Sequence, residues 1–242
     1  MFSLNDVERR TVGKGETMML EVTQELKKAY PGGSIGILAL SGMKSREVST
    51  RLEQEKKAVE ETLRSRFHHH DRSSLKSMEP IGSYSEYYQS FRKTYHVLLQ
   101  LESIVFKGKS IPTVSPAVEI MFMAELKNQM LTAGHDLDEV EGTLKAEVAQ
   151  PGRTYESMSG KTIETAAGDM MITDERGILS SIIYGPDQRT RITPETERVV
   201  YTVYAPPGIS KALVEEHLKD LEQYAALACS DVRVISEVVH EL

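Results

Sequence analysis

The chain has 242 residues, of which 40% are hydrophobic and 27% are charged, and its formal net charge is −7 at pH 7. The length allows one large domain or two small ones, and the negative charge argues against a broad basic surface, so we expect no DNA partner and restrict any RNA contact to a local patch. The lone cysteine, Cys229, and the lack of an apolar run near the roughly 20 residues of a membrane span favour a cytoplasmic protein without a membrane partner.

The amino-terminal part of the sequence predicts two strands followed by helices. The second strand has an unbroken apolar run between a Pro-Gly-Gly turn and Gly42, which indicates a buried strand. Between residues 45 and 67, apolar residues recur near helical spacing and charges fill the other face, which predicts a helix with one buried stripe. The expected elements are strands at 18–22 and 34–39, helices at 45–67 and 84–106, and a polar loop at 68–82.

A buried helix is predicted to begin at Pro116 and to end near Met130. Ser115 is suited to the N-cap, and proline is tolerated at the first helical position because its missing N–H has no helical partner. The helix is apolar on several sides, so we expect Met121 and Phe122 to be largely buried and Glu119 to be paired.

The rest of the chain alternates short strands with turns and closes with a helix and a strand. The expected strands are 144–148, 170–173, 178–184 and 199–204, followed by a helix capped by Ser210 and a short β-branched segment at 232–239. Strands and helices that mix irregularly indicate an α+β fold, with a mixed or mostly antiparallel sheet packed with helices.

Three consecutive histidines, His68 to His70, form the first candidate for chemistry. Neighbouring side chains of a regular helix or strand cannot converge on one ion, and no cysteine lies nearby, so we expect a solvated loop and no metal. The residues around them are basic and fit either a contact with a phosphate backbone or ordinary charge at an exposed helix end. These flanking residues are Arg64, Arg66, Arg72 and Lys76.

The segment from residue 115 to residue 136 reads SPAVEIMFMAELKNQMLTAGHD. It resembles a motif of the tRNA-editing domain of the phenylalanyl-tRNA synthetase β subunit, which reads roughly S-P-V-x-D-x-T-N-Y and ends M-H-A-F-D after a glycine-rich bend. The matching residues are Ser115, Pro116, Val118 and Asp136. The family's threonine falls on Met121 and its histidine on Ala133, so the resemblance implies a more apolar pocket here.

Residues 152–203 are similar to the second half of the same domain, with a strand ending in D-E-x-G, a polar loop and a T-x-E-T-x-x-V segment. The loop sequence QRTRIT at 188–193 resembles that of free-standing, single-domain relatives. The resemblance implies that residues 1–242 form one editing-domain-like unit with the α+β fold of that domain. Residues 1–80, where the pattern is weaker, would be its amino-terminal part.

The resemblance implies hydrolysis of mischarged aminoacyl-tRNA in trans, without a cofactor. Gly134 is expected to form a bend just after the buried helix, with His135 and Asp136 at that bend. His135 is the catalytic candidate because it lies two residues from the lost histidine, and Arg189 is the first candidate for binding a carboxylate or phosphate bidentately. Glu119 is either a structural partner or a recognition group for an amine. The substrate-binding candidates are Glu119, Met121, Ala133, Asp136, Tyr184, Arg189 and Thr190, with Tyr87, Tyr88 and Tyr184 as stacking platforms for the single-stranded tRNA end.

A concave pocket is expected between the end of the buried helix near His135 and the loop at 188–190. Because Met121 and Ala133 replace polar residues, the alternative is a non-catalytic protein that binds a small amino-acid-like ligand, RNA or a protein partner. The amino acid, the tRNA and the oligomeric state are left open by the sequence.

Overall fold

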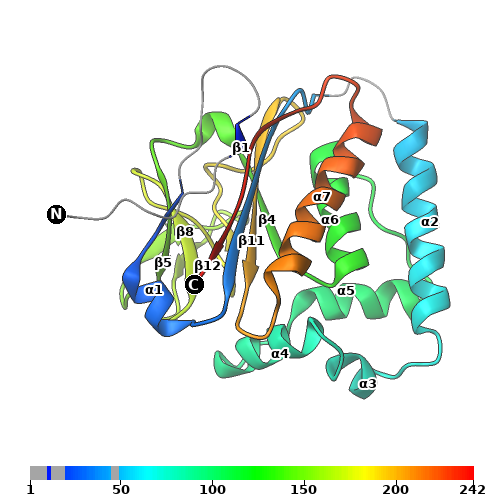
Figure 1. Ribbon diagram of the computed structural model, residues 1–242, viewed down its shortest axis with the longest axis horizontal. Coiled ribbons are helices and arrows are strands. Elements are labelled where there is room, and N and C mark those ends of the chain that lie inside the picture. The colour runs from blue at the N-terminus through cyan, green and yellow to red at the C-terminus, as the bar shows by residue number, and fades with distance from the viewer. Residues whose placement is uncertain (1–9, 12–19, 45–48) are drawn as a thin grey trace.

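A computed structural model describes residues 10–11, 20–44 and 49–242, and it shows a central sheet covered by helices on one face and by a second sheet on the other (Figure 1). The central sheet is antiparallel throughout, with the strand order β1-β12-β3-β11-β4. Its strands are β1 (Arg10–Thr11), β12 (Arg233–Glu241), β3 (Ser34–Ser41), β11 (Arg198–Ala205) and β4 (Thr132–Asp136).

The second sheet has the order β10-β9-β8-β5-β2 and is antiparallel except for the parallel pair β2 and β5. The predicted α+β fold with mixed and mostly antiparallel sheets is therefore confirmed. Its strands are β10 (Gly185–Pro186), β9 (Ile178–Ser181), β8 (Met170–Thr173), β5 (Leu144–Val148) and β2 (Leu20–Val22), and a separate hairpin joins β6 (Thr154–Glu156) to β7 (Thr162–Glu164).

Helices α6 and α7 cover the central sheet, α2 lies outside them, and α4 and α5 lie across one end (Figure 1). Strand β3 is buried along nearly its whole length because it is covered on both faces. Gly36 permits this packing, since a Cβ there would lie 2.7 Å from Val214 Cγ1 of α7. The helices are α1 (Gln24–Ala29), α2 (Thr50–Phe67), α3 (Arg72–Lys76), α4 (Ile81–Ser90), α5 (His96–Val105), α6 (Pro116–Asn128) and α7 (Lys211–Ala228), with a 3-10 turn, η1 (Leu137–Glu139).

Two sequence predictions about helices are wrong. Residues 68–82 are not all loop, because a capping box between Asp71 and Ser74 starts the short helix α3, and α4 begins at Ile81. The helix expected at 84–106 is two helices, and the break contains Arg92 with a left-handed φ of 57°. Residues 18–19 of the first predicted strand and residues 45–48 of the long helix lie outside the described residues.

A third correction concerns residues 132–136, which we expected to form a bend at Gly134. They form strand β4, which pairs with β11 along its whole length. Gly134 serves close packing here, because a Cβ on it would lie 2.8 Å from Ile192 Cδ1 and 3.4 Å from the sulfur of Met121. Strand β9 is shorter than predicted, since the chain turns after Ser181 and the Tyr184 N–H donates to the Ser181 hydroxyl.

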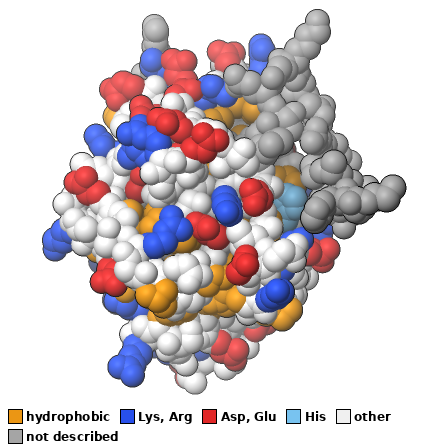
Figure 2. Space-filling view, turned by 90° about the vertical axis from the view of Figure 1, so that its left-hand side faces the viewer, with side chains coloured by type: hydrophobic (Ala, Val, Ile, Leu, Met, Phe, Trp, Pro, Cys, Tyr) orange, Lys and Arg blue, Asp and Glu red, His pale blue; other side chains and the backbone are white. Residues whose placement is uncertain are grey.

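The face of the molecule beyond the second sheet carries basic and acidic side chains that are interspersed (Figure 2). The described part of this face therefore presents no large surface of one sign that would suit a polyanion. None of the described helices combines the length and the apolar character that a membrane span requires.

Candidate functional site

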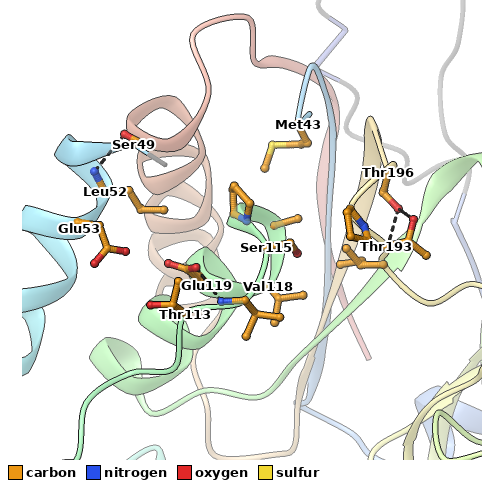
Figure 3. A pocket seen from close by; sticks show the side chains of 15 residues that line it. Met43, Ser49, Leu52, Glu53, Thr113, Ser115, Val118, Glu119, Thr193 and Thr196 are labelled. Atoms are coloured by element: carbon orange, nitrogen blue, oxygen red, sulfur yellow. Dashed lines mark hydrogen bonds between the residues drawn. The ribbon is translucent and has the colours of Figure 1, made fainter. Parts of the chain in front are cut away.

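A cavity of about 420 Å³ opens where α6 begins, between the start of α2 and the loop that precedes β11 (Figure 3). Residues 113–119 form its floor. Leu52 and Glu53 of α2, with the N-cap residue Ser49, form one wall, and residues 192–194 with Thr196 form the opposite wall. Met43 closes one end. The cavity thus combines segments that are far apart in the sequence.

The floor of the cavity contains the first turn of α6. Pro116 is at the first helical position and Ser115 is the N-cap residue, as predicted, but the Ser115 side chain makes no capping hydrogen bond. Its Oγ atom is buried and has no hydrogen-bond partner within the described part of the chain. Pro116 has no N–H, and the Val118 and Glu119 N–H groups both donate to the Ser115 carbonyl at 2.9 Å, so this floor suits a carbonyl oxygen or another electron-rich group mainly through the partial positive charge of the helix dipole.

A buried ion pair stabilises the wall between α2 and α6. The Lys56 ammonium lies 2.9 Å from Glu119 Oε2 and 2.6 Å from Glu53 Oε1, and it donates to the Thr113 hydroxyl at 3.0 Å. The other oxygen of Glu119 accepts the Val114 N–H at 2.8 Å. Burial lowers the pKa of Lys56, but the two carboxylates outweigh this effect and hold that pKa above its ordinary value.

This network gives Glu119 partners within the protein. Glu119 is 4% exposed and is paired, as predicted, and its partners are structural. Glu53 is the carboxylate with access to the cavity, because its side chain is 31% exposed. The two carboxylates outnumber the one ammonium, so this wall favours a cationic group such as an amine.

The opposite wall is polar and is fixed to β4. Thr193 N–H donates to the Thr196 hydroxyl at 2.9 Å, and that hydroxyl donates to Asp136 Oδ2 at 2.6 Å. Asp136, a predicted site residue, therefore acts behind the wall and reaches the cavity through Thr196. Ile192 adds an apolar surface beside these hydroxyls.

His135 lies away from this cavity, completely buried between the two sheets. Its Nδ1 atom is 2.8 Å from the Thr190 hydroxyl and its Nε2 atom is 3.1 Å from the Ser180 hydroxyl. Burial, with a smaller contribution from the Arg189 charge, lowers the pKa of His135 to about 3, so the ring is neutral at pH 7. We expected a concave pocket between His135 and the loop at 188–190, but His135 and Thr190 are both completely buried and contact each other there. The cavity described above lies at the start of α6 instead.

Met121 and Ala133, which replace the threonine and the histidine of the family motif, lie on opposite sides of β4. Met121 of α6 packs near Gly134, on the helical face of the strand. Side chains alternate along a strand, so Ala133 shares the other face with His135. Met121 and Phe122 are half-buried rather than largely buried, although both pack against the core.

Arg189 makes contacts within the protein through all of its guanidinium nitrogens. Nη2 lies 3.0 Å from both carboxylate oxygens of Asp174, Nε lies 3.6 Å from Asp187 Oδ2, and Nη1 donates to the Glu139 carbonyl. The Asp174 side chain is completely buried and also accepts backbone N–H groups of its own turn. Arg189 thus joins three loops and does not line the cavity.

The tyrosines expected to stack on the tRNA end are placed differently. Tyr87 and Tyr88 are 6% and 2% exposed, and their hydroxyls bind Asp169 and the Ile182 carbonyl, so neither is an accessible platform. Tyr184 is half-buried, and its ring carries the Lys93 ammonium 5.2 Å from its centre.

The cavity residues that the sequence did not single out come mainly from α2 and from residues 113–114. Ser115, Pro116 and Val118 were already marked by the motif, and residues 193–196 by the T-x-E-T segment. Ser49, Leu52 and Glu53 carried no local signal, because only tertiary packing brings the start of α2 to the start of α6.

Three comparisons with known proteins bear on this chain. A family model described as the B3/4 domain matches residues 84–220. The phenylalanine–tRNA ligase beta subunit of Tropheryma whipplei (strain Twist) is 26% identical over 90 residues, which is 37% of this chain and 9% of that protein. An amino-terminal fragment of the phenylalanyl-tRNA synthetase beta subunit from Pyrococcus horikoshii has a TM-score of 0.46 and 13% identity, over 91% of this chain and 52% of that one. This chain therefore spans about half of the solved fragment and less than a tenth of the ligase subunit.

Proposed function

This chain belongs to the B3/4 domain family, and from this premise we propose that the cavity at the start of α6 binds the aminoacyl group of an aminoacyl-tRNA. One observation carries the proposal: Ser115 and Pro116, which match the editing-domain motif, line a single cavity. The similar ligase subunit is named for tRNA charging, which supports a tRNA-linked ligand and a cytoplasmic location. We treat residues 1–242 as one unit because α2, which precedes the matched region, completes the cavity.

The chemistry of the cavity fits the parts of an aminoacyl group. The Glu53 carboxylate would bind the ammonium, and the start of α6 would face the carbonyl oxygen. Leu52, Val118 and Ile192 give the cavity an apolar surface, which favours an uncharged amino acid side chain. No cofactor is required for this recognition.

We further propose that the protein hydrolyses a mischarged aminoacyl-tRNA in trans. Water would attack the acyl carbon, the ester C–O bond would break, and the ribose oxygen would leave with a proton. The start of α6 would stabilise the negative charge that develops on the carbonyl oxygen, and the adjacent ribose hydroxyl would assist. The ester is already activated, so orientation of a water molecule is sufficient without a protein nucleophile.

A second candidate function, binding without hydrolysis, has its own support. The titratable side chains that line the described cavity are Glu53 and Glu119, and Glu119 is held by Lys56. General acid–base catalysis contributes roughly 100-fold or more where a positioned group performs it. A cavity whose accessible carboxylate is occupied by an amine would retain a small amino-acid-like ligand without cleaving it.

The two functions are separated by incubating the full chain with a panel of aminoacyl-tRNAs and measuring ester hydrolysis. Deacylation of a subset of the panel, slowed by Glu53→Gln, supports the hydrolase. The matched control is Glu61→Gln, an exposed glutamate on the same helix that does not line the cavity. Binding of aminoacyl-tRNA without turnover would support the second candidate, and neither binding nor turnover would reject both.

A further inference from the structure

A second cavity, of about 500 Å³, lies between α5, α6 and the segment that joins them. Helix α5 runs across the lower end of α6 (Figure 1). The walls are mainly apolar, with Leu99 and Ile104 from α5, Phe122 and Leu126 from α6, and Pro112 from the connecting segment. Leu99 is 40% exposed and Phe122 is half-buried, so the apolar walls are open to a small molecule from outside.

His96, the first residue of α5, adds an imidazole ring to this cavity. Its Nδ1 atom lies 3.2 Å from the hydroxyl oxygen of Tyr88, and that hydroxyl donates to the Ile182 carbonyl at 2.8 Å. A tyrosine hydroxyl has one proton and a carbonyl oxygen can only accept, so Tyr88 must be the acceptor in its contact with His96. In the neutral ring, Nδ1 of His96 therefore carries the proton and Nε2 has a free lone pair.

The protonation states of the two side chains agree with this geometry. Partial burial lowers the pKa of His96, so its ring is mainly neutral at pH 7. Burial raises the pKa of Tyr88 well above its ordinary value, so the phenol keeps its proton. The His96 side chain is exposed at the cavity, and its Nε2 atom makes no hydrogen bond to a described residue. Nε2 is thus a hydrogen-bond acceptor that water or a ligand satisfies.

Buried tyrosines fix the position of this imidazole. The rings of Tyr88 and Tyr95 are each 6.0 Å from the ring of His96, measured between centroids. Tyr95 stacks on Tyr84 with centroids 4.6 Å apart, and its hydroxyl donates to the Gln129 carbonyl at 2.9 Å. The start of α5 is therefore fixed to α4 and to the end of α6, so the acceptor keeps its place relative to the apolar walls.

The charges of the cavity restrict the ligand to a neutral donor. No aspartate or glutamate is among the described residues that line it, whereas Lys109 lines it and is exposed. An ammonium ligand would form no ion pair with the walls and would be near a like charge. A carboxylate would place its own acceptors opposite the Nε2 lone pair of His96. The donor that fits is an N–H or O–H of an uncharged group.

We propose that the second cavity binds a neutral aromatic molecule with one N–H or O–H donor, such as an indole or a phenol. The donor would bind Nε2 of His96, and the planar ring would pack against Phe122 and Leu99. The cavity volume lies within the roughly 300–1,000 Å³ that is typical of small-molecule sites. This site shares no lining residue with the first cavity, and it does not rest on the aminoacyl proposal.

The chain contains no tryptophan, so the fluorescence of added indole, excited beyond the absorption of tyrosine, reports binding to the full chain directly. The matched probe is N-methylindole, which keeps the aromatic ring and lacks the N–H. We expect saturable binding of indole, and binding of N-methylindole to be weaker by roughly tenfold because one hydrogen bond is lost. His96→Phe should weaken indole binding to the level of N-methylindole and leave N-methylindole within about twofold. The control is His69→Phe, which changes an exposed histidine outside the cavity and should leave both affinities unchanged.

The role of Tyr88 as a positioning residue has a separate readout. NMR of the imidazole nitrogens should show His96 with its proton on Nδ1 in the unmodified protein. Tyr88→Phe removes the acceptor that fixes this tautomer, so it should weaken indole binding and leave N-methylindole within about twofold. A proton on Nε2 in the unmodified protein, equal affinity for the two indoles, or no saturable binding overturns the proposal. Glu53→Gln should leave indole binding unchanged, so failure of the aminoacyl proposal is distinguishable from failure of this one.

Discussion

The buried ion pair behind the first cavity makes a quantitative prediction. Lys56 and Glu119 have side chains that are 5% and 6% exposed, and their charged atoms are 2.9 Å apart. Lys56→Met would keep the aliphatic stem and remove the ammonium, so Glu119 would remain buried without a cation. Breaking a buried pair in this way costs about 3–5 kcal/mol of unfolding free energy. The Val114 N–H continues to donate to Glu119, so we expect the lower end of that range, about 3 kcal/mol.

Two further variants isolate the charge effect. Lys56→Met combined with Glu119→Gln removes both charges and keeps an acceptor for Val114, so it should recover most of the loss. Lys57→Met changes an exposed lysine on the same helix and should stay within about 0.5 kcal/mol of the unmodified protein.

Urea unfolding followed by circular dichroism measures these differences, with an unchanged slope as the sign that the folded state is retained. A loss below about 1 kcal/mol for Lys56→Met would contradict the role given to the pair. A double variant as unstable as Lys56→Met would show that packing of the lysine stem, and not the unpaired carboxylate, causes the loss.

Three other predictions follow from the buried contacts. Arg189→Ala leaves the buried Asp174 carboxylate without its cation, so it should lower the unfolding free energy by about 3 kcal/mol. Ligand binding per folded molecule should stay unchanged. A normal melting temperature together with lost binding would show instead that Arg189 contacts the ligand. Burial lowers the pKa of His135 to about 3, so the neutral ring contributes its full stabilisation above pH 6.5, and this stabilisation is lost as the pH falls toward 3. In His135→Gln the unfolding free energy should therefore decline less between pH 7 and pH 4 than in the unmodified protein. Parallel plots of unfolding free energy against pH for the two proteins would refute this linkage. Gly134→Ala places a Cβ 2.8 Å from Ile192 Cδ1 and should lower the unfolding free energy by about 1–3 kcal/mol. Addition of Ile192→Val should recover part of that loss, and no recovery would show that this contact does not cause it.

The sequence predicted the fold best where the local pattern and the tertiary packing agree. The strands β5 and β8 have the predicted bounds, and α6 and α7 start where Pro116 and Ser210 indicated. The failures have physical causes. Gly134 was interpreted as a bend, but its missing side chain allows α6 and Ile192 to approach β4.

The candidate site was only partly predictable. The motif marked the floor of the cavity at Ser115 to Val118, because those residues form a helix start whose chemistry depends on local sequence. It also directed attention to His135 and Arg189, whose polar groups are used by Ser180, Thr190 and Asp174 inside the protein. Pairing across sheets and loops cannot be inferred from the spacing of one sequence.

The most direct test of the central claim is binding of a non-hydrolysable aminoacyl-adenosine analogue, in which an amide replaces the ester, followed by NMR of the backbone amides. Occupation of the first cavity predicts the largest shifts at Leu52, Val118 and Thr193, with shifts lost in Glu53→Gln and kept in Glu61→Gln. Shifts that instead surround His135, or binding that is indifferent to Glu53, would contradict the assignment of the aminoacyl site to the start of α6.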